Sequence, residues 1–198
     1  MQKVRLVLLA VCWAGVVTFG IYVAEPASSQ DERPNVLIIV TDDQRERDEM
    51  LVMPETLRIF GEGGTRFTHA FATTPQCCPS RASIFTGRYA HNTGVRRNQD
   101  ALNLNQMVTM QRYLQQRAGY KTALVGRYLN AWDIAENPPF FDRWALFNAG
   151  YWENDFNVNG EVRHLEQYAT DFIAEQSIEF LEEFDAEDDE QRWLMYVT

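Results

Sequence analysis

Basic residues are scarce in this sequence. It has 18 Lys and Arg against 28 Asp and Glu, which gives a formal net charge of -10 at pH 7. A phosphate backbone is bound mainly through Lys and Arg, so this balance argues against a general nucleic-acid-binding protein, and we expect no nucleic-acid partner. A local basic pocket for a small anion stays compatible with the overall charge. The sequence also lacks internal repeats, and its 45% apolar and 23% charged residues are typical of a globular protein.

Cysteine is scarce as well, with three residues in the chain. Cys12 lies in an apolar N-terminal run, which leaves the adjacent pair Cys77 and Cys78. Exported proteins usually pair cysteines to close loops, whereas neighbouring cysteines close no useful loop and their disulfide is strained. The pair is therefore expected to serve chemistry and not stability.

The N-terminal segment is the longest apolar run of the sequence. Lys3 and Arg5 precede the apolar residues 6–24, and a polar stretch of small residues follows at 25–30. This order predicts a signal peptide over residues 1–29, and hence a secreted or extracytoplasmic protein. The run is also close to the length that spans a bilayer, so an uncleaved N-terminal membrane anchor is the alternative. We expect no other membrane contact.

Residues 30–198 alternate between strand and helix patterns. The apolar run at 35–40 is typical of a strand buried on both faces of a parallel sheet, and residues 130–160, rich in Asn, Pro and aromatics, indicate a long irregular insertion. This alternation predicts an α/β fold with a mainly parallel sheet. Further strands are predicted at 65–72, 121–125 and 193–197, and helices at 53–60, 80–85, 106–118 and 168–184.

Two carboxylates directly follow the first predicted strand. Asp42 and Asp43 would lie beyond its carboxyl end, where ligands bind in open α/β sheets. Neighbouring carboxylates repel each other, and a cation with oxygen ligands, such as Ca²⁺ or Mg²⁺, would relieve that repulsion. The alternative is simple turn chemistry, because Asp commonly caps helices and forms Asx-turns.

The segment Cys77-Cys78-Pro79-Ser80-Arg81 opens a predicted helix. Free N–H groups at a helix start favour an anion, and Arg81, one turn on, could return its guanidinium to the same place and bind an oxyanion in a bidentate manner. The alternative is a pair of inert buried thiols. The grouping of all five residues favours the anion site.

These residues resemble a known family. Cys77-Cys78-Pro79-Ser80-Arg81 is similar to the C-x-P-S-R signature of type I sulfatases, the formylglycine-dependent branch of the alkaline-phosphatase-like superfamily. The similarity continues through residues 82–88, and the segments 34–43, 64–67 and 121–126 also match the family pattern. The motifs lie closest to glucosamine-6-sulfatase-like members. The resemblance implies a three-layer α/β sandwich.

The resemblance also implies roles for individual residues. Cys77 would be oxidised to Cα-formylglycine by a formylglycine-generating enzyme, and its hydrated aldehyde would attack the sulfur of a sulfate ester. Asp42 and Asp43, together with the modified Cys77, would bind Ca²⁺. Arg81 would neutralise charge near the metal, and Arg127 would take the place of a family Lys. The implied substrate is a sulfated small molecule or glycan.

The sequence departs from the family at several points. Arg127 keeps the charge of the usual Lys but not its compact ammonium, and Leu129 stands where a His is common. Family members continue well beyond this length, so residues 30–198 are expected to be the N-terminal part of a catalytic domain and an incomplete one. Two alternatives therefore stay open: a phosphonate or phosphate monoester or diester hydrolase of the same superfamily, and an inactive truncated fragment.

Overall fold

The computed structural model describes residues 33–45, 49–148, 150–187 and 190–198. The predicted signal peptide or anchor at 1–29 lies outside the described residues. In the described part of the chain, no helix has both the length and the apolar character needed to cross a membrane.

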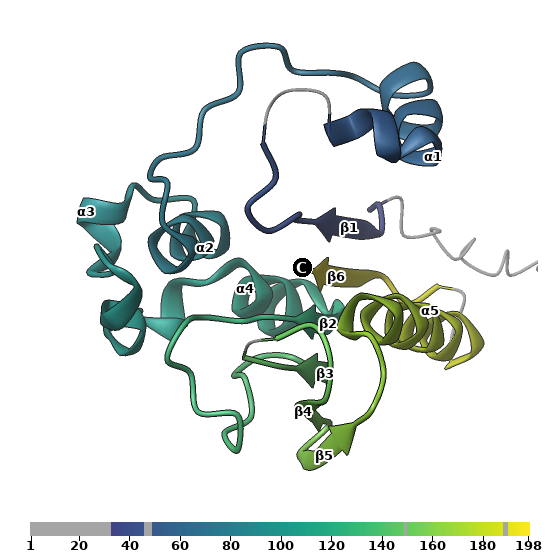
Figure 1. The fold of residues 1–198 in the computed structure, drawn as a ribbon. Helices are drawn as coiled ribbons and strands as arrows, with labels where there is room; N and C mark the ends of the chain where they lie inside the picture. The colour runs from purple at the N-terminus through teal and green to yellow at the C-terminus, as the bar shows by residue number, and fades with distance from the viewer. Residues whose placement is uncertain (1–32, 46–48, 149, 188–189) are drawn as a thin grey trace, which may run out of the picture. The chain divides into compact units, whose positions relative to one another are not determined.

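A mixed sheet runs through the described residues in the order β1-β6-β2-β3-β4-β5 (Figure 1). β1, β6, β2 and β3 are parallel to one another, while β4 and β5 extend the sheet in antiparallel pairing. The prediction of a mainly parallel sheet is confirmed. The strands are β1 (Val36–Ile39), β2 (Lys121–Gly126), β3 (Arg143–Leu146), β4 (Asn154–Val158), β5 (Glu161–Leu165) and β6 (Trp193–Val197).

Helices connect these strands. α2 begins at Cys77, earlier than the sequence predicts. α4 begins later than predicted, at Met110, after a separate 3₁₀ turn. The long helix α5 agrees with its prediction. The α-helices are α1 (Pro54–Thr56), α2 (Cys77–Thr86), α3 (Ala90–Thr93), α4 (Met110–Ala118) and α5 (Ala169–Glu187); the other helical segments are η1 (Glu49–Val52), η2 (Leu57–Glu62), η3 (Asn98–Asn103) and η4 (Gln106–Val108).

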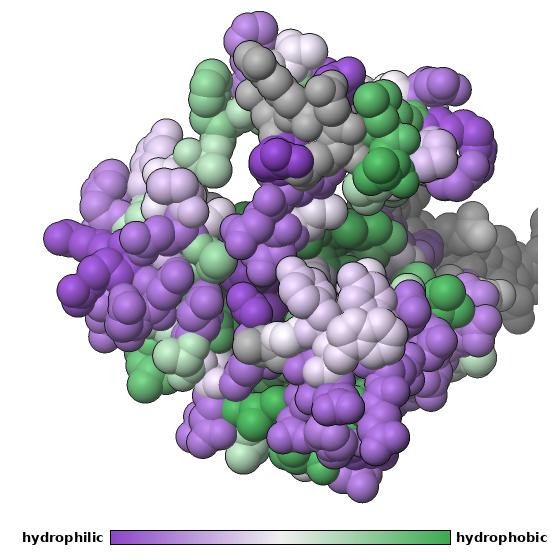
Figure 2. All heavy atoms as spheres, viewed as in Figure 1, coloured by the Kyte–Doolittle hydropathy of each residue, from purple (hydrophilic) through white to green (hydrophobic). Residues whose placement is uncertain are grey.

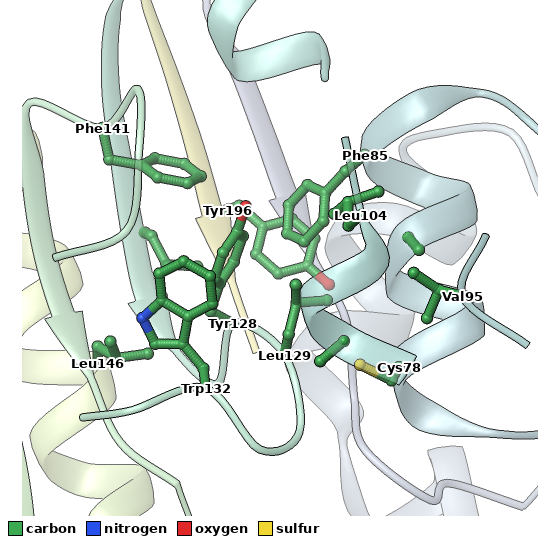
Figure 3. Close-up of a cluster of buried hydrophobic side chains, with 13 residues drawn as sticks. Cys78, Phe85, Val95, Leu104, Tyr128, Leu129, Trp132, Phe141, Leu146 and Tyr196 are labelled. Atoms are coloured by element: carbon green, nitrogen blue, oxygen red, sulfur yellow. The ribbon is translucent and has the colours of Figure 1, made fainter. Parts of the chain in front are cut away.

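The sheet has a hydrophobic core on each face, because alternate residues of a strand point to opposite sides. On one face, Leu124 and Tyr196 pack with Phe85 of α2, whose ring centroid lies 4.8 Å from that of Tyr196 (Figure 3). On the other face, Met195 packs with Phe180 of α5. Helices on both faces of a central sheet make three layers, as the resemblance implied.

Three local predictions are wrong. Residues 65–72 form no strand, because no strand of the described residues pairs with them. Phe67 and Phe71 in this segment are 78% and 88% exposed. β1 is not buried on both faces, since it lies at the sheet edge and leaves Leu37 and Ile39 exposed. The region 130–160 is not wholly irregular, because it contains β3, which pairs with β2, and β4, which pairs with β3.

Candidate active site

The predicted site residues lie where the parallel strands end. Ile39 of β1 pairs in register with Val197 of β6, and Val197 pairs with Val125 of β2. Asp42 follows β1 by three residues and Arg127 directly follows β2, so both extend from the carboxyl edge of the sheet. Ligands bind at this edge in open α/β folds, and the structure places the candidate residues there.

Cys77 is the first residue of α2. The preceding Gln76 is extended (φ -100, ψ 140), and the next amide, that of Cys78, donates to Asn98 Oδ1 at 3.0 Å, so a side chain from another segment satisfies one free donor of the helix start. Cys77 Sγ lies 3.8 Å from Asp42 Oδ1. The helix start therefore brings this thiol to the carboxylate that follows β1.

The two adjacent cysteines are in opposite environments. Cys78 is 0% exposed and packs in the core beneath α2, whereas Cys77 is only half-buried. Burial raises the pKa of the Cys78 thiol to about 11, because a thiolate is poorly solvated in the core. Of the two thiols, only that of Cys77 is therefore accessible at the pocket.

Two arginines converge on Asp42. Arg81 Nη2 lies 3.7 Å from Asp42 Oδ1, and Arg127 Nη1 lies 3.5 Å from Asp42 Oδ2. Arg81 is buried and donates through Nη1 to the Arg127 carbonyl at 2.7 Å, while the Arg127 guanidinium lies over the Phe147 ring at 5.9 Å. Burial raises the pKa of Tyr196, and neighbouring Arg81 opposes that rise. Two guanidinium groups therefore lie at the carboxylate that the Cys77 thiol faces, where they could also bind an oxyanion.

Asp42, Asp43 and Cys77 form a cluster of potential metal ligands. One ligand atom from each lies within 4.8 Å of the others, and both carboxylates are exposed. Asp43 has φ 52, a left-handed conformation that is uncommon for a residue with a side chain and is found often at functional sites. The cluster opens into a pocket of about 340 Å³ lined by residues 40–44, 72, 74–77, 80, 81 and 84.

Comparison with known proteins shows the family of the chain. The Sulfatase family matches residues 34–198. The chain belongs to the sulfatase family. It is 39% identical over 168 residues to the Drosophila melanogaster extracellular sulfatase SULF-1 homolog, covering 78% of this chain and 15% of that protein. It is also 33% identical over 173 residues to the N-acetylglucosamine-6-O-sulfatase of Bacteroides thetaiotaomicron, covering 82% of this chain and 30% of that protein.

A solved structure shows the same fold. It contains a protein in complex with its substrate D-glucosamine-2-N,6-O-disulfate and superimposes with a TM-score of 0.71 at 31% sequence identity, covering 84% of this chain and 34% of that chain. This sulfatase chain thus has the α/β fold of the solved structure. It spans about a third of that chain's length, and less than a third of the length of the two relatives above.

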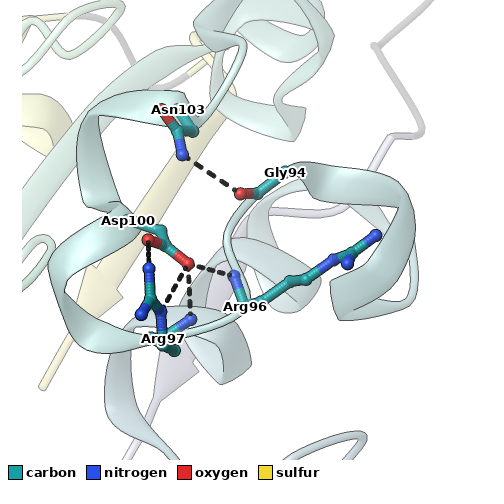
Figure 4. A network of polar contacts seen from close by, with 5 residues as sticks. All are labelled: Gly94, Arg96, Arg97, Asp100 and Asn103. Atoms are coloured by element: carbon teal, nitrogen blue, oxygen red, sulfur yellow. Dashed lines mark hydrogen bonds and ion pairs between the residues drawn. The ribbon is translucent and has the colours of Figure 1, made fainter.

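The candidate site also depends on a supporting residue that the sequence does not predict. Asn98 holds the amide of Cys78, and its own loop is fixed by Asp100, whose carboxylate accepts from the backbone amides of Arg96 and Arg97 at 3.2 and 3.0 Å (Figure 4). The Arg97 guanidinium holds the pKa of Asp100 below its usual value. Asn98 lies in a polar stretch with no motif, so nothing in the sequence marks it.

Proposed function

We propose that this chain forms the nucleophile and part of the anion site of a sulfuric ester hydrolase that acts on sulfated sugars. The observation that carries the proposal is the position of Cys77 at the start of α2, with its Sγ 3.8 Å from Asp42 Oδ1 and two guanidinium groups on the same carboxylate. Family membership supports the reaction class.

Cys77 would enter the reaction as formylglycine. In that form its hydrated aldehyde supplies an oxygen nucleophile for sulfur, and the Sγ atom of the unmodified residue marks where this group would lie. Cys78 cannot take this part because its thiol is buried. Conversion would require a formylglycine-generating enzyme as a partner of the chain.

The donor set at the site fits a hard cation. The carboxylates of Asp42 and Asp43 would hold Ca²⁺ together with the modified Cys77, since oxygen atoms of this kind are the ligands that Ca²⁺ prefers. When bound, the ion would supply positive charge for the sulfate oxygens. The pocket that these residues line is open to solvent, so an ion could enter.

Arg81 and Arg127 would bind and orient the sulfate group. Arg81 is held by the Arg127 carbonyl, so its fork of donors is fixed before a ligand arrives and little entropy is lost on binding. The stacking of Arg127 on Phe147 restricts the second guanidinium in the same way. Their charge would stabilise the sulfuryl oxygens as negative charge develops on them.

The substrate class and the export of the protein are also proposed. Relatives named as N-acetylglucosamine-6-sulfatases and a relative named as an extracellular sulfatase support a sulfated amino-sugar substrate and an exported protein. Residues 1–29 would direct export, as a cleaved signal or an anchor, and residues 30–198 would form part of the catalytic domain.

The test is conversion of Cys77. Coexpression with a formylglycine-generating enzyme should reduce the mass of the peptide that contains Cys77 by about 18 Da, the difference between thiol and aldehyde. Cys78→Ser should be converted as the parent chain is, and Cys77→Ser should not be converted. The mass of this peptide reports the modification of Cys77 alone, so the test does not require the chain to hydrolyse a substrate.

An unmodified Cys77 under these conditions would overturn the proposal. For converted protein, the substrate class is then measured by sulfate release from N-acetylglucosamine 6-sulfate, in parallel with hydrolysis of a p-nitrophenyl phosphonate. Preference for the phosphonate would assign the chain to the phosphonate and phosphate ester hydrolases of the same superfamily.

A further inference from the structure

Three aromatic side chains gather on the surface beyond β3. Tyr151 and Trp152 lie on the β3–β4 connection, 69% and 66% exposed, and Tyr168 precedes α5. The ring centroid of Tyr168 lies 6.2 Å from that of Tyr151 and 5.2 Å from that of Trp152. We call these three residues the aromatic platform. Figure 2 shows residues of intermediate hydropathy, the class that includes Tyr and Trp, gathered over the start of α5.

The platform is held in place by the backbone. The amide of Ala169, the first residue of α5, donates to the Tyr151 carbonyl at 2.8 Å. Gly150 has φ 96, and a Cβ there would lie 2.4 Å from Oδ1 of buried Asn154, so the connection packs closely on β4. The backbone beside Tyr151 is thus anchored, and both exposed rings pack on Tyr168, so less freedom is lost when a ligand binds.

The platform lies on the same edge of the sheet as the anion site. β3 ends at this edge in register with β2, and its connection to β4 begins directly beyond it. The Arg127 guanidinium, which faces Asp42, also lies over Phe147, the first residue after β3. Tyr151 and Trp152 directly precede β4, which is four interstrand steps from β1 in the sheet order, or about 19 Å. A glycan of a few sugar units spans such a distance.

The chemistry of the platform selects the kind of ligand. The C–H face of a hexose ring is apolar and weakly positive, so it stacks on the negative face of Tyr or Trp. The charged residues nearest the rings along the chain, Glu153, Glu166 and Asp171, are all acidic and exposed. They would accept hydrogen bonds from sugar hydroxyls and amides, and would repel a second sulfate.

We propose that Tyr151, Trp152 and Tyr168 form a stacking subsite for an unsulfated sugar ring of the glycan whose sulfate group binds beside Asp42, Arg81 and Arg127. This inference rests on the proposed function and adds a specificity to it. The chain recognises a sulfated unit within an oligosaccharide whose other units are neutral, in preference to a uniformly sulfated polymer.

The experiment is calorimetric titration of the 198-residue chain with the neutral trisaccharide of N-acetylglucosamine. The parent chain should bind, and Trp152→Ala should weaken binding about tenfold, the effect of losing one aromatic face. Trp152→Phe should retain most of the affinity, because it keeps a ring. Tyr113→Ala, which removes a 49% exposed aromatic from α4, should bind as the parent does.

Absence of trisaccharide binding, or equal affinity of Trp152→Ala and the parent chain, would overturn the inference. The fully 6-O-sulfated trisaccharide should lose affinity by much less than tenfold in Trp152→Ala, and an equal loss for both sugars would overturn the preference for a neutral ring. These titrations need no hydrolysis. A chain that binds the trisaccharide through Trp152 but is never converted at Cys77 would refute the proposed function alone.

Discussion

At the scale of single residues, the difference between two neighbouring thiols can be measured. With a pKa of about 11, Cys78 has a thiolate fraction of roughly one in a thousand at pH 8. In the folded chain, iodoacetamide at pH 8 should therefore alkylate Cys77 and leave Cys78 unmodified, as read by tandem mass spectrometry of the shared peptide. Cys77→Ser should abolish labelling of that peptide, and urea should restore labelling at Cys78. Equal labelling of both thiols in native protein would contradict the assigned burial.

The grouping of the site residues follows from features that a sequence displays. Asp42 and Arg127 each follow an apolar strand, and Cys77 opens a helix, so topology alone brings them to one edge of the sheet. Asn98 could not be predicted, since its position depends on the loop fixed by Asp100. The catalytic and metal-binding roles of the grouped residues stay predictions.

At the scale of elements, the end of β2 depends on a glycine. Gly126 has φ 109, and a Cβ there would lie 1.8 Å from the Thr198 carbonyl oxygen, so β6 could not approach β2 as it does. Gly126→Ala should lower the free energy of unfolding by about 2–4 kcal/mol in urea titrations. Gly119→Ala is the matched control, because Gly119 also has positive φ (71) but nothing within 4 Å of its added Cβ. It should cost about 1–2 kcal/mol, and equal losses in the two variants would show that the close approach is unimportant.

The elements that the sequence predicts correctly are those with a strong local pattern. β2 and β6 are apolar runs buried in the middle of the sheet, and α5 has helical spacing over its whole length. β3 and β4 have no such pattern, because they are short and contain Asn, Asp and Arg, so their structure depends on pairing with a neighbour. The segment 65–72 shows the converse: it alternates as a strand does, but pairing in the described structure does not support it.

At the scale of the whole described chain, the two cores account for the layered fold, but they leave one end of the sheet uncovered. α5 packs against β2, β3 and β6. β1 lies beyond β6 at the edge, where Leu37 and Ile39, on the same side of the strand, are 42% and 56% exposed. The sequence pattern of β1 resembles that of a central strand. Its edge position could not be predicted, because hydropathy does not show which apolar run will lie at the edge of a sheet.

An apolar strand face at a sheet edge favours association between copies of the chain. Sedimentation equilibrium should show self-association that rises with concentration, and Ile39→Lys should weaken it about tenfold through loss of about 1.5 kcal/mol of apolar burial. Leu102→Lys is the control, since it makes the same charge change at a 75% exposed leucine on η3, away from the sheet edge. If the edge face drives association, only Ile39→Lys shifts the equilibrium toward monomer. A parent chain that stays monomeric, or two lysine variants with the same effect, would show that the exposed face of β1 does not associate.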